Sequence, residues 1–150
     1  MEVSKDIQDS LQKCGIRRDV DVWQISLTRK KLTGVPDLSR FHFLRKLWLN
    51  NNKIRELSCR SLNCCLTELY LQNNNIKSIS GALNHLTCLR LIFLHNNQIR
   101  GLDDTVHELR KMQQLQTAKV KSVERRRSFQ MHSQDRHRVL QSVAFGRRVS

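Results

Sequence analysis

One leucine pattern recurs at nearly constant spacing through the middle of the chain. The strings LWLNNNKI, LYLQNNNI and LIFLHNNQI begin at Leu47, Leu69 and Leu91. They fit one template, LxxLxLxxNxIxxI, whose four copies start at positions 22, 44, 66 and 89, in steps of 22, 22 and 23 residues. A repeat of this length predicts a stack of similar coils, because a single coil cannot bury its apolar face alone.

Each slot of the template has a physical role. The LxL pair predicts a short strand whose two leucines point inward and whose middle residue points outward. The asparagine that follows is expected to turn inward, where its amide can satisfy backbone groups of the turning chain. We therefore predict a structural ladder of Asn52, Asn74 and Asn97. The first copy has Lys30 in this slot, as suits a terminal coil.

The residues before the repeat predict a helix that covers the first coil. Residues 4–14 place Ile7, Leu11 and Cys14 on one face at helical spacing. Ser4 is the residue type that favours the N-cap position of such a helix. One apolar stripe of this helix is therefore expected to lie over the open end of the repeat.

The residues after the fourth copy depart from the pattern. A helix is predicted over 103–114, and a partial fifth strand begins near Ala118. Residues 118–150 hold nine lysine and arginine residues and two acidic ones, so they carry half of the net charge of +14. We expect this tail to be partly disordered or helical, with a short amphipathic helix near 137–145.

These observations predict an α/β fold with three segments. Residues 1–21 form the N-terminal cap helix and entry, 22–117 form four coils with a partial fifth, and 118–150 form the basic tail. The architecture expected is a short right-handed solenoid with parallel strands on a concave face and helices or turns on the convex face.

The LxLxxNxI cores and the 22-residue step resemble the intracellular class of leucine-rich repeat. That class occurs in protein phosphatase 1 regulatory subunits, a spliceosomal snRNP protein and axonemal dynein light chain 1. The resemblance implies a cytoplasmic setting, with a ciliary or axonemal one as a narrower possibility. Such proteins usually finish the last strand with an Asn-Pro turn and a capping segment. Here LQTAKVKSVERRRS stands in that place, so the usual C-terminal cap is expected to be missing.

The changing slot between the inward leucines holds aromatic residues in three successive copies. Trp48, Tyr70 and Phe93 are expected side by side on the concave face, between Ser26 and Lys119. Exposed aromatic rings with polar neighbours are typical of protein-binding hot spots. Two alternatives remain: the rings pack only against each other, or the basic tail folds back over them. The other candidate partner-binding residues are Lys46, Glu68, Leu91 and His95.

The strong positive charge favours an acidic partner and raises nucleic acid as the rival to a protein partner. However, the tail interleaves few aromatic residues among its arginines, only Phe129 and Phe145, and it lacks an RNA-recognition signature. Nucleic acid is therefore the less favoured partner. RRRS at 125–128 and RRVS at 147–150 resemble basophilic kinase sites, with Ser128 and Ser150 as the acceptors.

No sequence motif indicates catalysis or a bound cofactor. The chain has no P-loop, no GxGxxG and no GxSxG, and its six histidines are scattered. Five cysteines without a secretory signal favour reduced thiols inside the cell. No apolar run reaches the roughly 18 residues of a membrane span. We therefore expect a non-catalytic, monomeric scaffold or adaptor without metal or cofactor, and the partner is not identified.

Overall fold

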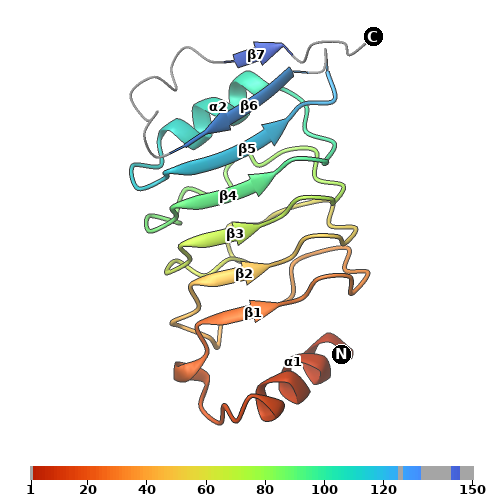
Figure 1. Cartoon of the computed structure of the whole chain (residues 1–150), viewed down its shortest axis with the longest axis vertical. Coiled ribbons are helices and arrows are strands. Elements are labelled where there is room, and N and C mark those ends of the chain that lie inside the picture. The colour runs from red at the N-terminus through yellow and green to blue at the C-terminus, as the bar shows by residue number, and fades with distance from the viewer. Residues whose placement is uncertain (1, 125–126, 133–142, 146–150) are drawn as a thin grey trace.

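The computed structural model describes residues 2–124, 127–132 and 143–145. Seven strands form a single sheet in chain order: β1 (Gln24–Ser26), β2 (Lys46–Trp48), β3 (Glu68–Tyr70), β4 (Leu91–Leu94), β5 (Thr117–Lys121), β6 (Arg127–Met131) and β7 (Val143–Phe145). The pairings from β1 to β5 are parallel, and the last two are antiparallel. Figure 1 shows this ladder of strands between helix α1 (Glu2–Lys13) at one end and α2 (Leu102–Arg110) near the other.

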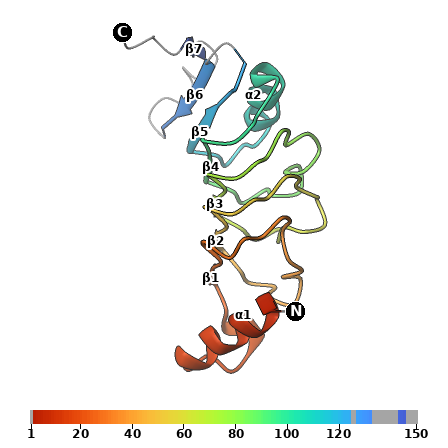
Figure 2. The ribbon, with the colours of Figure 1, turned by 90° about the vertical axis from the view of Figure 1, so that its right-hand side faces the viewer.

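The register of the parallel strands is the one that the repeat predicts. Leu47 pairs with Leu69, and Trp48 pairs with Tyr70. Leu47 and Leu49 are fully buried on the inner side, whereas Trp48 between them is half-buried on the outer side. The strands line one side of the molecule and the turns line the other, with α2 on the turn side beside β5 and β6 (Figure 2). The leucine-rich solenoid fold is therefore confirmed.

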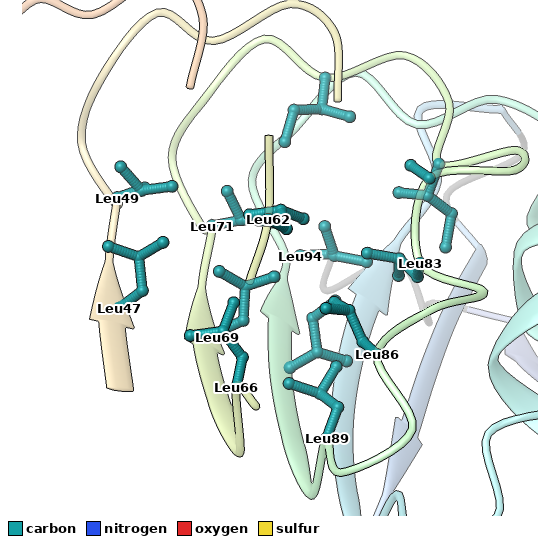
Figure 3. Packing of buried hydrophobic residues seen from close by; sticks show 14 of the residues in the cluster. Leu47, Leu49, Leu62, Leu66, Leu69, Leu71, Leu83, Leu86, Leu89 and Leu94 are labelled. Atoms are coloured by element: carbon teal, nitrogen blue, oxygen red, sulfur yellow. The ribbon is translucent and has the colours of Figure 1, made fainter. Parts of the chain in front are cut away.

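Leucines from the turns close the core from the other side. Leu62, Leu83 and Leu86 are buried in the turn segments. Figure 3 shows them facing the strand leucines across the interior of the coils. Because each coil contributes only a few side chains, the core is a continuous column that runs from coil to coil.

The predicted asparagine ladder is present. Nδ2 of Asn74 donates to the carbonyl oxygens of Leu49 (2.9 Å) and Leu71 (3.1 Å), and Oδ1 accepts from the Ile54 N–H (3.0 Å). One side chain thus joins two coils by satisfying buried backbone groups that have no strand partner. The equivalent side chains, Asn52 and Asn97, make corresponding bonds to their own preceding coils.

The N-terminal cap helix differs in detail from the sequence prediction. Helix α1 runs over Glu2–Lys13, so Ser4 lies inside it, and the predicted Ser4 N-cap is wrong. Ile7 and Leu11 are buried against the first coil, but Cys14 lies beyond the helix and is exposed. The chain then passes a short 3-10 helix, η1 (Asp19–Asp21), before it enters β1.

The end of the fourth coil follows the prediction more closely. Helix α2 begins at Leu102, with Asp103 and Asp104 in its first turn, where the helix dipole favours negative charge. Val106 and Leu109 are buried on its inner face. The helix ends at Arg110, so Met112 packs against the core from the following turn.

The C-terminal segment contains strands where a helical or disordered tail was expected. Strand β6 returns antiparallel along β5, and its Phe129 and Met131 are buried opposite Val120 and Ala118. This hairpin covers the core at the last parallel strand, β5. The solenoid is therefore capped by a β-hairpin in place of the usual Asn-Pro turn and capping segment. The expected helix near 137–145 is wrong at 143–145, which form β7, and its remaining residues lie outside the described ranges.

Candidate functional site

The outward side chains of β1 to β5 form one surface, which we call the strand face. The central row of this face holds Ser26, Trp48, Tyr70, Phe93 and Lys119, in register across five strands. On one side of it runs a second row, made of Gln24, Lys46, Glu68, Leu91 and Thr117. On the other side lie Thr28, Asn50, Gln72, His95 and Lys121.

The three aromatic rings form a continuous row of contacting rings, which we call the aromatic stack. The Trp48 and Tyr70 ring centroids are 5.1 Å apart with planes 3° from parallel. Phe93 meets Tyr70 edge-on at 5.6 Å, and His95 meets Phe93 at 5.6 Å. All four side chains are half-buried. The rings therefore pack against each other, as one alternative proposed, and still present part of their surface on the strand face.

A charged pair fixes one side of this stack. Lys46 Nζ lies 2.8 Å from a carboxylate oxygen of Glu68, and the Tyr70 hydroxyl donates to the other oxygen at 3.0 Å. Burial and this hydrogen bond to Glu68 raise the pKa of Tyr70 to about 12. The tyrosine is therefore neutral at physiological pH, and its hydroxyl is held in place by the carboxylate.

The C-terminal end of the strand face is basic. Lys119 and Lys121 are exposed on the outward side of β5, opposite Gln130 and Ser128 of β6. Within the described ranges, no acidic side chain forms an ion pair with either lysine. Burial, and then the charge of Lys119, lower the pKa of His95. The imidazole is therefore mainly neutral at physiological pH and leaves the positive charge on the lysines.

A groove lies at the opposite end, between α1 and β1. It has a volume of about 430 Å³ and is lined by apolar side chains that include Ile7, Leu11, Ile25 and Trp48. Asp6 and Lys30 form a 3.6 Å ion pair among its lining residues. Because Trp48 belongs to both features, the groove continues into the aromatic stack.

Sequence reasoning missed a second asparagine ladder on the turn beside the strand face. Nδ2 of Asn73 donates to Oδ1 of Asn51 at 2.6 Å, and Asn96 donates to Asn73 at 2.8 Å. All three residues have left-handed backbone, with φ between 55° and 60°, a conformation that asparagine tolerates better than most residues. The NN dipeptide in the last three copies of the repeat was the available signal.

The remaining candidate residues lie away from the aromatic stack or outside the described ranges. Ser128 is half-buried on β6, paired in register with Lys121, and Ser150 falls outside the described residues. No group of three or more His, Cys, Asp or Glu side chains among the described residues is placed to hold a metal ion. No helix in the described part of the chain is long and apolar enough to cross a membrane.

Two comparisons with known proteins agree with this geometry. A family model for leucine rich repeats (2 copies) matches residues 66–115. A crystal structure of an internalin from Listeria monocytogenes is similar in fold, with a TM-score of 0.61 and 23% sequence identity. The similarity covers 79% of this chain and 42% of the internalin chain, so the present chain spans less than half of that protein. The family model agrees with the leucine-rich repeats at residues 66–115, and the internalin structure agrees with the solenoid fold described above.

Proposed function

We propose that this chain is a non-catalytic scaffold that binds a segment of a protein partner on its strand face. The observation that carries the proposal is the stack of Trp48, Tyr70 and Phe93 on three adjacent strands. Tryptophan and tyrosine dominate the energetics of protein interfaces, because they bury a large apolar area and lose few rotamers. Here the rings are already held against each other, so binding needs little further ordering of side chains.

The nucleic-acid alternative has less support from the tail. Phe129 is 1% exposed in the hairpin core, so its ring cannot serve as a stacking platform for bases. Arg127 makes two hydrogen bonds to the Asp103 carboxylate, at 2.7 and 3.1 Å, and its charge is therefore compensated within the fold. Both residues belong to the stretch that raised RNA as the rival partner.

Proximity labelling in cells tests the proposal. The wild-type chain is compared with the triple variant Trp48→Ala/Tyr70→Ala/Phe93→Ala. A matched control is Phe43→Ala/Val123→Ala, because these side chains are 52% and 44% exposed away from the stack. We expect the triple variant to lose a set of labelled proteins that the wild type and the control retain. Circular dichroism must show native folding for the comparison to count.

A second variant keeps the test valid if the triple variant fails to fold. Ser26 is exposed on β1 next to Trp48 in the central row, so Ser26→Arg adds bulk to the strand face without touching the core. We expect Ser26→Arg to reduce the labelling of the same set of proteins. If both folded variants label the same proteins as the wild type, the strand face is not the binding surface.

The setting of the binding is part of the proposal. Outside the repeats, the strings QKCGIRRDVDV and VLQSVAFG resemble leucine-rich repeat-containing protein 72. Together with the intracellular class of repeat, this resemblance supports a cytoplasmic placement that extends to cilia and axonemes. Microscopy of the tagged full chain in ciliated cells tests the placement, and a signal confined to the nucleus would contradict it.

A further inference from the structure

We infer that the bound segment is an extended peptide with an acidic end: a bulky apolar side chain occupies the groove beside α1, and Asp or Glu carboxylates pair with Lys119 and Lys121. This inference rests on the proposed function, because it assumes that the strand face is the binding surface. The inference adds which side chains the bound peptide carries. It also says which end of the peptide is apolar and which end is acidic.

The charge distribution on the strand face carries the first step. Glu68 neutralises the charge of Lys46 at a distance of 2.8 Å. This side of the aromatic stack therefore offers no unpaired positive charge to an anionic ligand. Lys119 and Lys121 point to the same side of β5, and the described residues offer neither of them an acidic partner. Their neighbours across the hairpin, Gln130 and Ser128, are uncharged. A carboxylate on the partner complements this end.

His95 strengthens the same step. Its ring lies 5.6 Å from the Phe93 ring, so it joins the aromatic stack to the basic end. The charge of Lys119 contributes to the lowered pKa of His95, which places the lysine within electrostatic range of the imidazole. An anion bound at Lys119 would therefore also lie near His95, and it would raise the pKa of the imidazole.

The groove carries the second step. Its lining includes the core residues Ile7, Leu11 and Ile25 together with Trp48. Because the ion pair of Asp6 and Lys30 is already made, the groove offers mainly apolar contact. A cavity of about 430 Å³ accommodates a leucine, phenylalanine or similar side chain. The rings of Trp48, Tyr70 and Phe93 then form an apolar path from this anchor to the basic end.

The spacing of the strands sets the length of the segment. The path from β1 to β5 crosses four strand spacings of about 4.8 Å each, or roughly 19 Å in total. An extended chain advances at most about 3.3–3.6 Å per residue. The apolar anchor and the first carboxylate are therefore expected about six residues apart in the bound peptide.

A phage-displayed library of random dodecapeptides provides the probe. It is panned against the full-length chain, with the Trp48→Ala/Tyr70→Ala/Phe93→Ala variant used to subtract background. We expect enriched peptides to carry a bulky apolar residue and, about six positions away, one or two Asp or Glu residues. The most enriched sequence is then synthesised with a fluorescent label for anisotropy titrations.

Charge variants locate the acidic end. Lys119→Glu/Lys121→Glu is compared with Lys53→Glu/Lys77→Glu. The second variant changes the net charge by the same amount, but its lysines are exposed in the turns outside the five strands. We expect the first variant to bind about tenfold more weakly and the second to bind nearly as the wild type does. A peptide whose acids are replaced by lysine should regain affinity for the first variant only.

Each outcome has a separate meaning. An equal loss of peptide affinity in both charge variants would show that the peptide is attracted to the positive charge of the whole chain. That result would overturn the assignment of the acidic end to Lys119 and Lys121, but the strand face would remain the proposed binding surface. Preference for a phosphoserine version over the carboxylate version in the same titration would also overturn the choice of Asp or Glu. No enrichment over the triple alanine variant would overturn the proposed function and this inference together.

Discussion

At the scale of single residues, adjacent asparagines in one repeat do different work. Asn74 is 4% exposed and bonds to backbone groups of two coils. Asn73 is exposed and adopts φ of 60°, and its side chain bonds to the side chains of Asn51 and Asn96. Their chemistry is identical, so the difference comes from where the turn places each side chain.

This difference predicts a clear ranking of two substitutions. Asn74→Leu leaves the buried Ile54 N–H without its partner. It also removes one of the two side-chain hydrogen bonds that the Leu49 carbonyl accepts, and the bond from Asn52 stays. At about 1–3 kcal/mol for an orphaned buried group, with the weakened carbonyl bond added, we expect a loss of about 2–3 kcal/mol in the free energy of unfolding. Asn73→Ala should cost about 1 kcal/mol, the usual penalty of a left-handed alanine. Urea unfolding followed by tryptophan fluorescence measures both, and the reverse order would mean that the assigned register is wrong.

The same residues show what the sequence could reveal. The inward positions of Leu47, Leu49 and Asn74 followed from spacing alone, because each coil has only one way to bury its apolar pair. The Asn51–Asn73–Asn96 ladder was missed, since hydrogen bonds between exposed side chains leave no periodic signature in hydrophobicity. The order of the central row was predicted, but the angle between neighbouring rings depends on side-chain packing, which the sequence does not specify.

At the scale of elements, the C-terminal hairpin is the main departure from expectation. Phe129 and Met131 alternate with polar residues in β6, which is a strand pattern. The signal was hidden because Phe129 and Met131 are the only apolar residues in positions 128–137, directly after the arginine run RRR at 125–127. The run suggested a solvated tail, whereas Arg127 is tied to Asp103 in the first turn of α2. The pairing of segments 24 residues apart was not visible in local composition.

The hairpin is predicted to act as the cap of the solenoid. Phe129→Ala removes a ring that is 1% exposed and should cost about 3–5 kcal/mol. Val123→Ala is the control, because that side chain is 44% exposed and should cost little. In a stack of repeats, loss of an end cap acts first on its nearest neighbour.

Hydrogen exchange should localise this effect. In Phe129→Ala we expect faster exchange in α2 and β5, with protection in β2 and β3 largely retained. Equal loss of protection along all coils would show that the solenoid unfolds as one unit. Unchanged exchange in α2 and β5 would show that β6 does not cap the core.

At the scale of the whole molecule, two titratable side chains on the strand face, Tyr70 and His95, limit the pH range of stability. Burial raises the pKa of Tyr70 to about 12 from its ordinary 10.0, and it lowers the pKa of His95 below its ordinary 6.5. Both shifts favour the neutral side chain. The folded state therefore holds the aromatic stack uncharged over a wider pH range than the unfolded chain would.

The direction of each shift predicts the shape of the stability curve. A raised pKa means that the folded state keeps a proton that the unfolded state loses, so the Tyr70 contribution declines as pH rises from 10.0 to about 12. The lowered pKa of His95 means that the unfolded state binds its proton first, so this contribution declines as pH falls below 6.5. Burial also raises the pKa of the Cys65 thiol above 9.0. The contribution of Cys65 to the free energy of unfolding therefore also declines at alkaline pH.

We therefore expect the free energy of unfolding, measured by urea titration at a series of pH values, to be highest between the two declines. Tyr70 is the chain's only tyrosine, so tyrosinate absorbance follows it directly in the same samples. Tyr70→Phe keeps a ring in the stack and should reduce the decline above pH 10.0 to the part that Cys65 contributes, while His95→Gln should flatten the decline below 6.5. If the wild type and Tyr70→Phe decline in parallel, or if tyrosinate forms near pH 10.0 in a chain that is still folded, the hydroxyl is not held as the structure places it. A tyrosinate midpoint near 12 would tie the alkaline decline in stability to the burial of Tyr70 and to its hydrogen bond with Glu68 at the centre of the strand face.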